Sequence, residues 1–179
     1  CYWFRGMKVK VGVMGSAGEA AQGASGAALR AKAEALGRAI AARGCVALTG
    51  GTTGLPHAAG AAAHAAGGLH VGVSPASDAR EHVERFGLPL AGTDVLVYTG
   101  FGLKGRNVVL VRSCDVVLIF RGGMGTLNEL TIAHDEGARR RMPQGHGRRR
   151  RRGRAPAERS AKEVERGRHL RRGARAPAR

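Results

Sequence analysis

The segment best suited to chemistry lies at residues 120–130, where an apolar run ends in a glycine-rich turn. It reads Phe-Arg-Gly-Gly-Met-Gly-Thr-Leu-Asn-Glu-Leu. A strand that ends in glycines and leads into a helix exposes several backbone N–H groups at the positive end of the helix dipole, which suits a phosphate. We therefore predict that a phosphate lies against Gly122, Gly123, Gly125 and Thr126.

Glu129 follows Thr126 by three residues, about one turn along the predicted helix. A carboxylate is an unusual neighbour for a bound anion unless it has a role of its own, such as binding a sugar hydroxyl or moving a proton. Glu129 could bind ribose hydroxyls or stabilise positive charge on the sugar as a glycosidic bond breaks. The alternatives are a solvated Glu129 that complements the helix dipole and a Thr126 that serves only as the helix N-cap.

Two further glycine-rich turns follow apolar runs, at residues 15–18 and 50–54. Arg106 lies near the start of a predicted helix, where the dipole does not favour a cation, so it is either a countercharge for a bound anion or an ordinary exposed residue. We predict Arg106 and Glu129 as the catalytic pair if there is catalysis. The two turns would add ligand contacts from Gly15, Ser16, Gly50, Gly51, Thr52 and Gly54.

The periodicity of apolar residues predicts strands that alternate with helices. A polar loop at 74–92 is expected to contain a helical turn near 79–86. The alternation favours an α/β fold, a Rossmann-like parallel sheet of about five strands with helices on both faces. The glycine-rich turns would then line one crevice at the carboxyl ends of the strands. The expected strands are 8–14, 46–49, 70–73, 94–98 and 115–120, and the expected helices are 27–42, 55–66, 103–112 and 124–135.

Several classes of function are disfavoured. No turn matches the dinucleotide pattern G-x-G-x-x-G, and no acidic residue follows a second strand in the position that binds ribose, which argues against an NAD or FAD enzyme. A P-loop lysine is also missing from the glycine-rich turns. His57 and His64 lack a third ligand at suitable spacing, and His134 with Asp135 and Glu136 is better explained as a helix C-terminus of mixed charge, so we predict no metal site. Asp115 is expected to start a strand rather than act as a base. Three cysteines without metal-ligand spacing, and no apolar stretch of about 20 residues, favour a reduced cytoplasmic protein without a membrane partner.

The charge of the chain is unevenly distributed. Of the net charge of +17, residues 1–137 carry +3 and residues 138–179 carry +14. The second segment has one Val, one Leu and one Met but no Ile, Phe, Tyr or Trp, so it cannot bury enough apolar surface to offset its ordering entropy. We expect a domain at 8–137, a disordered Arg-rich tail at 138–179, and a non-native leader at 1–7 that ends at the natural start, Met7.

The glycine-rich segments, together with Gly105-Arg106-Asn107, carry a family resemblance. They resemble the LOG family of Rossmann-like nucleotide-binding proteins, once described as lysine decarboxylases, whose motif is P-G-G-x-G-T-x-x-E with an Arg-Lys pair on the preceding helix. The resemblance covers roughly residues 8–137. It implies that Arg106 is the motif arginine, Glu129 the motif carboxylate and the turn at 122–126 the phosphate loop. Similar proteins include phosphoribohydrolases of cytokinin riboside 5′-monophosphate and molybdenum-cofactor carriers.

Two departures from the family pattern bear on activity. Arg121 stands where the family has Pro, and Asn107 stands where the hydrolases have Lys. We therefore expect binding of a nucleotide or a related phosphorylated small molecule, with no resident cofactor, although a molybdenum-cofactor-like ligand is compatible with the resemblance. The alternative within enzymes is a phosphoribohydrolase that cleaves the N-glycosidic bond of a nucleoside 5′-monophosphate. The resemblance also implies a homo-oligomer if the fold is complete.

The segment after Gly137 departs further from the family, which would continue into another apolar strand and a closing helix. Its Arg, Gly, Ala and Pro alphabet is typical of GC-rich DNA read out of frame, so we expect that the family reading frame is lost there. If the tail is genuine, the alternative function is nucleic-acid binding, in which the Arg run at 148–152 contacts phosphates with a steep dependence on salt.

Overall fold

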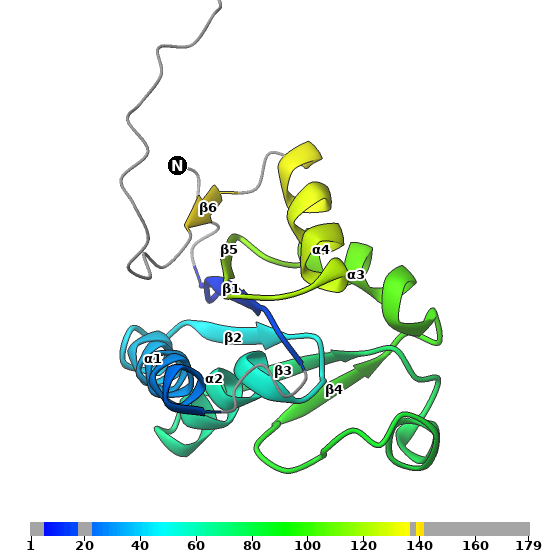
Figure 1. The fold of residues 1–179 in the computed structure, drawn as a ribbon, viewed down its shortest axis with the longest axis horizontal. Coiled ribbons are helices and arrows are strands. Elements are labelled where there is room, and N and C mark those ends of the chain that lie inside the picture. Colours follow the sequence, from blue (N-terminus) through cyan, green and yellow to red (C-terminus); the bar gives the residue numbers. More distant parts are fainter. Residues whose placement is uncertain (1–5, 18–22, 137–138, 142–179) are drawn as a thin grey trace, which may run out of the picture. The chain divides into compact units, whose positions relative to one another are not determined.

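The computed structural model describes residues 6–17, 23–136 and 139–141, and the strands in these ranges form one parallel sheet (Figure 1). The sheet has six strands in the order β4-β3-β2-β1-β5-β6, and every neighbouring pair is parallel. The predicted Rossmann-like α/β fold is therefore confirmed. The strands are β1 (Lys10–Met14), β2 (Val46–Thr49), β3 (Leu69–Ser74), β4 (Val95–Tyr98), β5 (Val116–Ile119) and β6 (Arg139–Arg141).

The order of the strands reverses once along the chain. From β1 to β4 each strand is added on one side of its predecessor, and the chain then crosses over to place β5 on the other side of β1. In an open α/β sheet, such a reversal leaves a crevice at the carboxyl ends of the two strands that flank it. The loops that follow β1 and β5 therefore lie where a ligand-binding crevice is expected.

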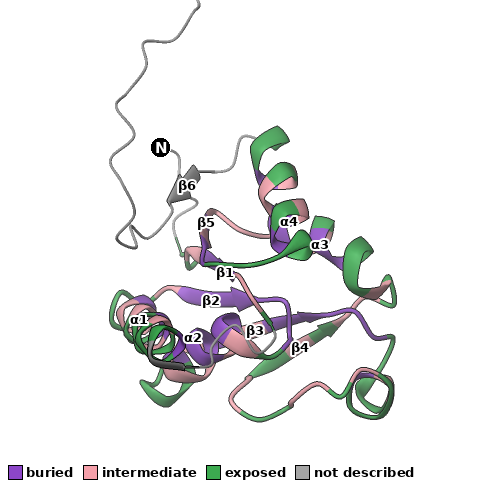
Figure 2. Cartoon of the chain, viewed as in Figure 1, coloured by how far each residue is buried: buried purple, intermediate pink, exposed green. Residues whose placement is uncertain are grey.

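Helices cover both faces of the sheet, as the sequence predicts (Figure 1). Successive residues of β1 and β2 point to opposite faces, so that Val13 and Ala47 pack with the first helix pair while Met14 and Leu48 pack with the second. These central strands are buried, whereas β4 at the edge alternates exposed and half-buried residues (Figure 2). The first pair is α1 (Gly23–Ala42) and α2 (Gly54–Ala65), and the second is α3 (Gly102–Arg112) and α4 (Met124–Asp135).

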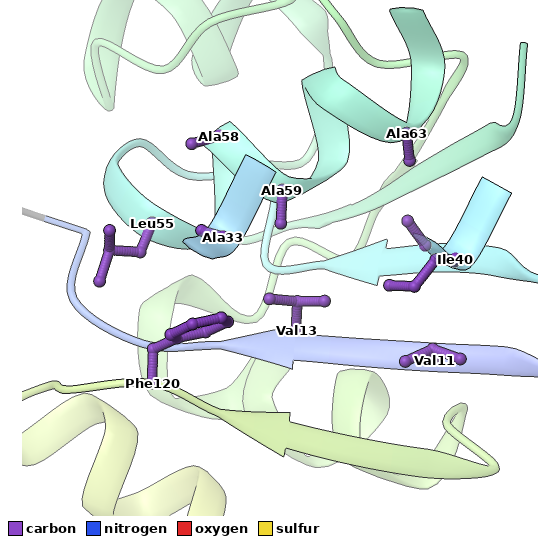
Figure 3. Close-up of a cluster of buried hydrophobic side chains, with 10 residues drawn as sticks. Val11, Val13, Ala33, Ile40, Leu55, Ala58, Ala59, Ala63 and Phe120 are labelled. Carbon is purple, nitrogen blue, oxygen red and sulfur yellow. The ribbon is translucent and has the colours of Figure 1, made fainter. Parts of the chain in front are cut away.

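Small residues let α1 and α2 approach closely. The core between these helices and the sheet contains alanines from both, together with Leu55 and Ile40, and Phe120 closes it beside Val13 (Figure 3). At Gly37 in α1, an added Cβ would collide with the backbone carbonyl oxygen of Ala59 in α2. This contact fixes the distance between the helices and, through α2, the place of the turn that precedes it.

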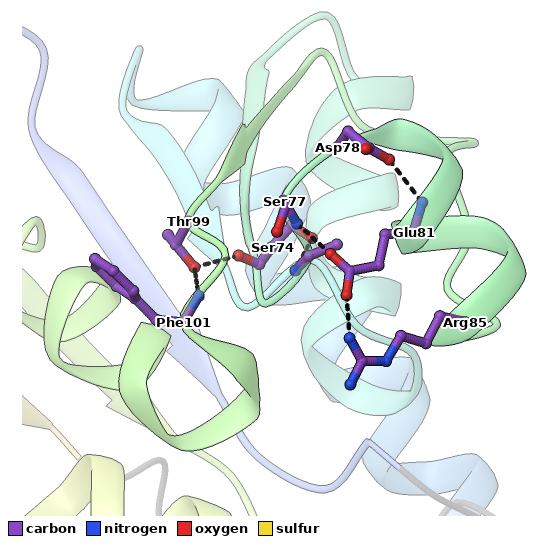
Figure 4. Close-up of polar contacts among 8 residues, drawn as sticks. Ser74, Ser77, Asp78, Glu81, Arg85, Thr99 and Phe101 are labelled. Carbon is purple, nitrogen blue, oxygen red and sulfur yellow. Dashed lines mark hydrogen bonds and ion pairs between the residues drawn. The ribbon is translucent and has the colours of Figure 1, made fainter.

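The segment between β3 and β4 is held by polar contacts (Figure 4). The carbonyl oxygen of Ser74 accepts hydrogen bonds from the backbone N–H and the hydroxyl of Thr99, at 3.2 and 2.7 Å. The Glu81 carboxylate accepts the N–H of Ser77 at 2.7 Å and pairs with Arg85. The helical turn predicted near 79–86 is present as a short π-helix, η2 (Glu81–Arg85).

The predicted ends of the nine expected elements agree with the structure to within one residue, with two exceptions. Helix α1 begins four residues before its predicted start, and β1 begins two residues after its predicted start. Residues 139–141, which the sequence assigned to the tail, form β6 beside β5. Most of the predicted leader at 1–7 and most of the predicted tail at 138–179, which includes the Arg run at 148–152, lie outside the described residues, as does Gly18 of the first turn. Among the described helices, none combines the length and the apolar character needed to cross a bilayer.

We expect Gly37→Ala to destabilise the protein by about 1–3 kcal/mol, because the added methyl group overpacks the contact with Ala59. Gly125→Ala in α4 is the matched control, since nothing lies within 4 Å of its added Cβ, and it should be neutral or gain up to about 1 kcal/mol from helix propensity. Urea unfolding measures both free energies. Equal effects of the two substitutions would contradict the close packing of α1 on α2.

Candidate functional site

Backbone hydrogen bonds join the three glycine-rich loops. The N–H of Ser16, after β1, donates to the carbonyl oxygen of Arg121, after β5, at 2.7 Å. The carbonyl oxygen of Ser16 accepts the N–H of Leu55 in the first turn of α2 at 3.0 Å. The Thr53 hydroxyl also donates to the carbonyl oxygen of Ala17. The loop at 15–17 therefore bridges the two others and fixes their separation.

A cavity of about 340 Å³ lies at these loops, at the carboxyl ends of β1, β2 and β5. Its size suits a small-molecule ligand, because such sites usually measure roughly 300–1,000 Å³. It is lined from the three loops and from the helices α3 and α4. The lining residues are Val13, Met14, Gly15, Ser16, Ala17, Gly50, Thr52, Pro56, Leu103, Lys104, Arg106, Asn107, Gly123, Gly125, Thr126 and Glu129.

Arg106 and Glu129 form a buried ion pair in this cavity. Arg106 Nη1 donates to Glu129 Oε1 at 3.3 Å, and the two residues are only 6% and 7% exposed. The guanidinium lies against the backbone of Gly50, where an added Cβ would collide with it. Arg106 Nε is buried and has no hydrogen-bond partner among the described residues. The pair therefore leaves the buried Nε–H of the guanidinium without a hydrogen-bond partner among the described residues.

Burial raises the pKa of Glu129 above its ordinary value, while the charge and hydrogen bond of Arg106 act in the opposite direction. Withdrawal from water disfavours the carboxylate, and the neighbouring cation restores part of its stability. Glu129 therefore accepts a proton more readily than an exposed glutamate does. It can also accept a hydrogen bond from a ligand hydroxyl. This is a property expected of a site residue rather than of a solvated helix residue.

Asn107, which stands at the hydrolases' lysine position, makes a hydrogen bond across the helix pair. Its amide Nδ2 donates to Asn128 Oδ1 at 2.9 Å, and the residue is buried. The contact ties α3 to α4 next to the ion pair. Asn107 lines the cavity with a neutral group, so it brings no positive charge to the ligand.

The turn at 122–126 leads into α4, whose first residue is Met124 and whose N-cap position is Gly123. Thr126 is therefore inside the first turn and is not the N-cap, which excludes one alternative that the sequence left open. Its side chain occupies the space beside Gly122, where an added Cβ would collide with the hydroxyl. The first N–H groups of α4 have no intrahelical acceptor and lie beside the cavity.

The structure brings most of the sequence-predicted site residues together. Arg121 is exposed, and its backbone carbonyl serves the loop contact described above. Gly51, Gly54 and Gly122 shape the turns without lining the cavity, and the N–H of Gly51 donates to the Thr49 hydroxyl at 3.3 Å. The predicted residues that do line it are Gly15, Ser16, Gly50, Thr52, Arg106, Gly123, Gly125, Thr126 and Glu129.

Sequence reasoning missed Lys104, which lines the cavity with an exposed side chain. Its ammonium group has no hydrogen-bond or ion-pair partner among the described residues. Leu103 and Lys104 each precede a lining residue of α3 by three positions, so all four share one helix face. That spacing could have identified Lys104 once Arg106 had been placed at the site.

A buried histidine lies behind the turn at 50–54. His70 of β3 is fully buried, and desolvation is the main cause that lowers its pKa from the ordinary value of 6.5. Hydrogen bonds occupy both ring nitrogens, one to the Thr49 hydroxyl and one to the carbonyl oxygen of Gly92. The residue is therefore neutral at neutral pH.

Asp115 and Cys114 have structural roles at the start of β5. The Asp115 carboxylate accepts hydrogen bonds from the backbone N–H and the ammonium of Lys10, at 2.8 and 2.9 Å. This agrees with its expected role at the beginning of a strand. Burial raises the pKa of the Cys114 thiol to about 12, so this cysteine is a weak nucleophile.

A parallel sheet with a ligand-sized cavity at its carboxyl ends defines a Rossmann-like ligand-binding protein. The chain belongs to the SLOG cluster4 family, whose model matches residues 8–141. The narrower assignment to the LOG family, which the sequence motifs suggested, is not confirmed by this match.

Relatives of this chain include proteins that are named for a cofactor. The molybdenum cofactor binding protein from Rippkaea orientalis is 33% identical, with a TM-score of 0.64 over 76% of each chain. The Moco carrier protein from Chlamydomonas reinhardtii is 29% identical, with a TM-score of 0.63 over 76% of each chain. A protein from Archaeoglobus fulgidus is 34% identical over 104 residues, which span 58% of this chain and 63% of that protein.

We expect Glu129→Ala to destabilise the protein by about 3–5 kcal/mol, because it leaves the Arg106 charge buried without its partner. The double variant Arg106→Met/Glu129→Leu should recover most of that loss, since it removes both charges and keeps the volume. Denaturant unfolding of the three proteins checks this. If the double variant is as unstable as Glu129→Ala or less stable, the loss does not come from an unpaired Arg106 charge and the ion pair is not the coupled unit described here.

The free energy of unfolding should fall as the pH drops below 6.5, because the unfolded chain then binds a proton at His70 that the folded protein does not. The contribution of His70 to the free energy of unfolding is complete above pH 6.5, the ordinary pKa that the unfolded chain shows. It is lost as the pH falls from 6.5 to the lower pKa of the folded state, at up to about 1.4 kcal/mol per pH unit. Imidazole NMR titration should give a midpoint below 6.5 for His70. A midpoint at or above that value would refute the assignment.

Proposed function

We propose that this protein binds a phosphorylated small molecule, of the nucleoside monophosphate or pterin phosphate type, in the cavity at the carboxyl ends of β1, β2 and β5. The observation that carries the proposal is the convergence, on one cavity, of the α4 N-terminus with Arg106 and Glu129. The phosphate would lie against the N–H groups at 123–126, where the helix dipole favours an anion. The sugar or ring would lie toward the ion pair.

The charges of the cavity support an anionic ligand. The buried pair of Arg106 and Glu129 is neutral as a unit, so the remaining formal charge of the lining residues is the ammonium of Lys104. A phosphate monoester could be contacted by Lys104 from the rim and by N–H groups from the α4 N-terminus. Two similar proteins are named for the molybdenum cofactor, a pterin that carries a phosphate, and the proposed ligand class includes it.

Binding is a better-supported proposal than hydrolysis. The neutral Asn107 amide stands where the hydrolases have a lysine, and it is engaged with Asn128 rather than free to contact substrate. Glu129 remains suited to contact a ribose hydroxyl, so N-glycosidic cleavage is the second candidate. Incubation with adenosine monophosphate separates the two, because cleavage releases free adenine and ribose 5-phosphate while simple binding leaves the nucleotide intact.

Isothermal titration with adenosine monophosphate, adenosine and inorganic phosphate tests the proposal on the full chain. Adenosine monophosphate should bind at one site, and adenosine should bind more weakly because it lacks the phosphate. Lys104→Gln should weaken the binding of adenosine monophosphate by about two- to fivefold, which corresponds to one exposed ionic contact. Lys32→Gln is the matched control, since Lys32 is exposed on α1 and does not line the cavity.

The binding of adenosine monophosphate should not depend on the basic tail. Replacement of the five arginines at 148–152 by glutamine, in the full chain, should leave this affinity unchanged, because the lining residues lie between Val13 and Glu129. The same variant reports on the nucleic-acid alternative. If the wild type bound single-stranded DNA but not the mononucleotide, and the variant lost the DNA binding, the tail would be the functional segment and the cavity proposal would fail.

A further inference from the structure

A chain of buried hydrogen bonds leads from β3 to the turn that follows β2. His70 Nδ1 lies 2.5 Å from the carbonyl oxygen of Gly92, and His70 Nε2 lies 2.9 Å from the Thr49 hydroxyl. The backbone N–H of Gly51 donates to the same hydroxyl at 3.3 Å. His70 and Thr49 are almost completely buried. Neither residue lines the cavity, so their polarity is not explained by direct contact with a ligand.

The direction of each hydrogen bond follows from the chemistry of the partners. A carbonyl oxygen only accepts, so His70 Nδ1 carries the proton, and the neutral ring then offers Nε2 as an acceptor. The Thr49 hydroxyl donates to Nε2 and accepts the N–H of Gly51. Both ring nitrogens and the hydroxyl are thereby satisfied. This arrangement sets the direction of the Gly51 N–H, which points into the protein and away from the cavity.

Other charged and titratable groups hold the histidine in place. The backbone N–H of His70 donates to Asp94 Oδ2 at 2.7 Å, and Asp94 Oδ1 lies 2.8 Å from His64 Nδ1. The ring of His57 lies 6.5 Å from that of His70, measured between centroids. Gly60 of α2 approaches the imidazole so closely that an added Cβ would collide with it. The ring therefore has one orientation available.

This chain of hydrogen bonds fixes the turn at 50–51, and that turn contacts Arg106, the catalytic candidate. Gly51 has φ of +61°, a left-handed conformation that glycine adopts at low cost, and it directly follows Gly50. The guanidinium of Arg106 packs on the backbone of Gly50, with no room for a side chain there. A displacement of this turn would therefore either release the guanidinium from Glu129 or fill the space that it occupies.

We propose that Thr49 and His70 are positioning residues of the ligand site, which hold the turn at 50–51 so that Gly50 backs the Arg106 guanidinium. This inference rests on the proposed function, because it assigns these residues a role in ligand affinity. A hydroxyl at position 49 is the required group, since it alone joins the imidazole to the Gly51 amide. The two residues act on the ligand through Arg106 and do not touch it.

The matched pair Thr49→Val and Thr49→Ser tests the proposal on the full chain. Valine keeps the shape and removes the hydroxyl, whereas serine keeps the hydroxyl and removes a methyl group. Thr49→Val should weaken the binding of adenosine monophosphate by about fivefold, near the value of one neutral hydrogen bond, and Thr49→Ser should restore it. If Thr49→Val does not fold, Thr49→Ala carries the same comparison, because it also lacks the hydroxyl.

A second readout needs no ligand. The amide resonance of Gly51 and the Nε–H resonance of Arg106 should shift in Thr49→Val and return toward the wild-type positions in Thr49→Ser. The Gly51 amide loses its hydrogen-bond acceptor in either case, so the Arg106 resonance is the one that decides. A merely structural role would lower the free energy of unfolding and leave the Arg106 Nε–H resonance and the affinity of the folded protein unchanged, and that result would overturn the inference.

The two readouts also separate this inference from the proposed function. If the wild type does not bind adenosine monophosphate but the Arg106 Nε–H resonance responds as expected, the choice of ligand is wrong and the positioning of Arg106 is supported. If the wild type binds and neither the affinity nor the Arg106 resonance responds to the loss of the hydroxyl, the proposed function stands and the positioning role is refuted.

Discussion

The buried ion pair between Arg106 and Glu129 is the interaction on which the rest of the site depends. Two charges withdrawn from water are tolerated only when their geometry is held by the surrounding structure. That geometry comes from α3 and α4, which the hydrogen bond between Asn107 and Asn128 ties together, and from Gly50, which leaves room for the guanidinium. The contact between the two helices and the missing side chain at Gly50 keep this ion pair buried. The pair still lines the cavity, so a ligand can reach it.

The topology of the sheet decides where such a pair can serve a ligand. Because the strand order reverses between β1 and β5, the loops after these strands lie at a crevice. The loop at 15–17, after β1, is hydrogen-bonded both to the loop after β5 and to the first turn of α2. The cavity is thus lined by residues more than 100 positions apart in the chain. Its N–H groups, its buried ion pair and Lys104 are compatible with a phosphorylated ligand, while apolar lining residues such as Val13, Met14 and Leu103 are available to the rest of such a ligand.

Local patterns were sufficient for most of the fold. The apolar runs and the glycine-rich turns predicted four helices and five strands, because hydrophobic periodicity and glycine's conformational freedom act over a few residues. The early start of α1 and the strand β6 were not anticipated. The first four residues of α1, Gly23 to Gly26, are poor helix signals because two of them are glycines. Strand β6 consists of three arginines, a sequence with no apolar residue to indicate a strand. It was therefore found only from its backbone pairing with β5.

The sequence by itself determined the glycine-rich pattern at 122–126 and the candidates Arg106 and Glu129. The spacing of Glu129 from Thr126 can be read along one helix, and Arg106 was found through its place in a family motif. Only the tertiary structure decided that the two side chains meet at 3.3 Å and that Gly51 turns its N–H toward Thr49 instead of the cavity. It also placed Lys104 at the rim and His70 behind the turn. These facts depend on distances between residues from different strands and helices, which are fixed by packing and by the order of the strands and are not encoded in any local stretch of the chain.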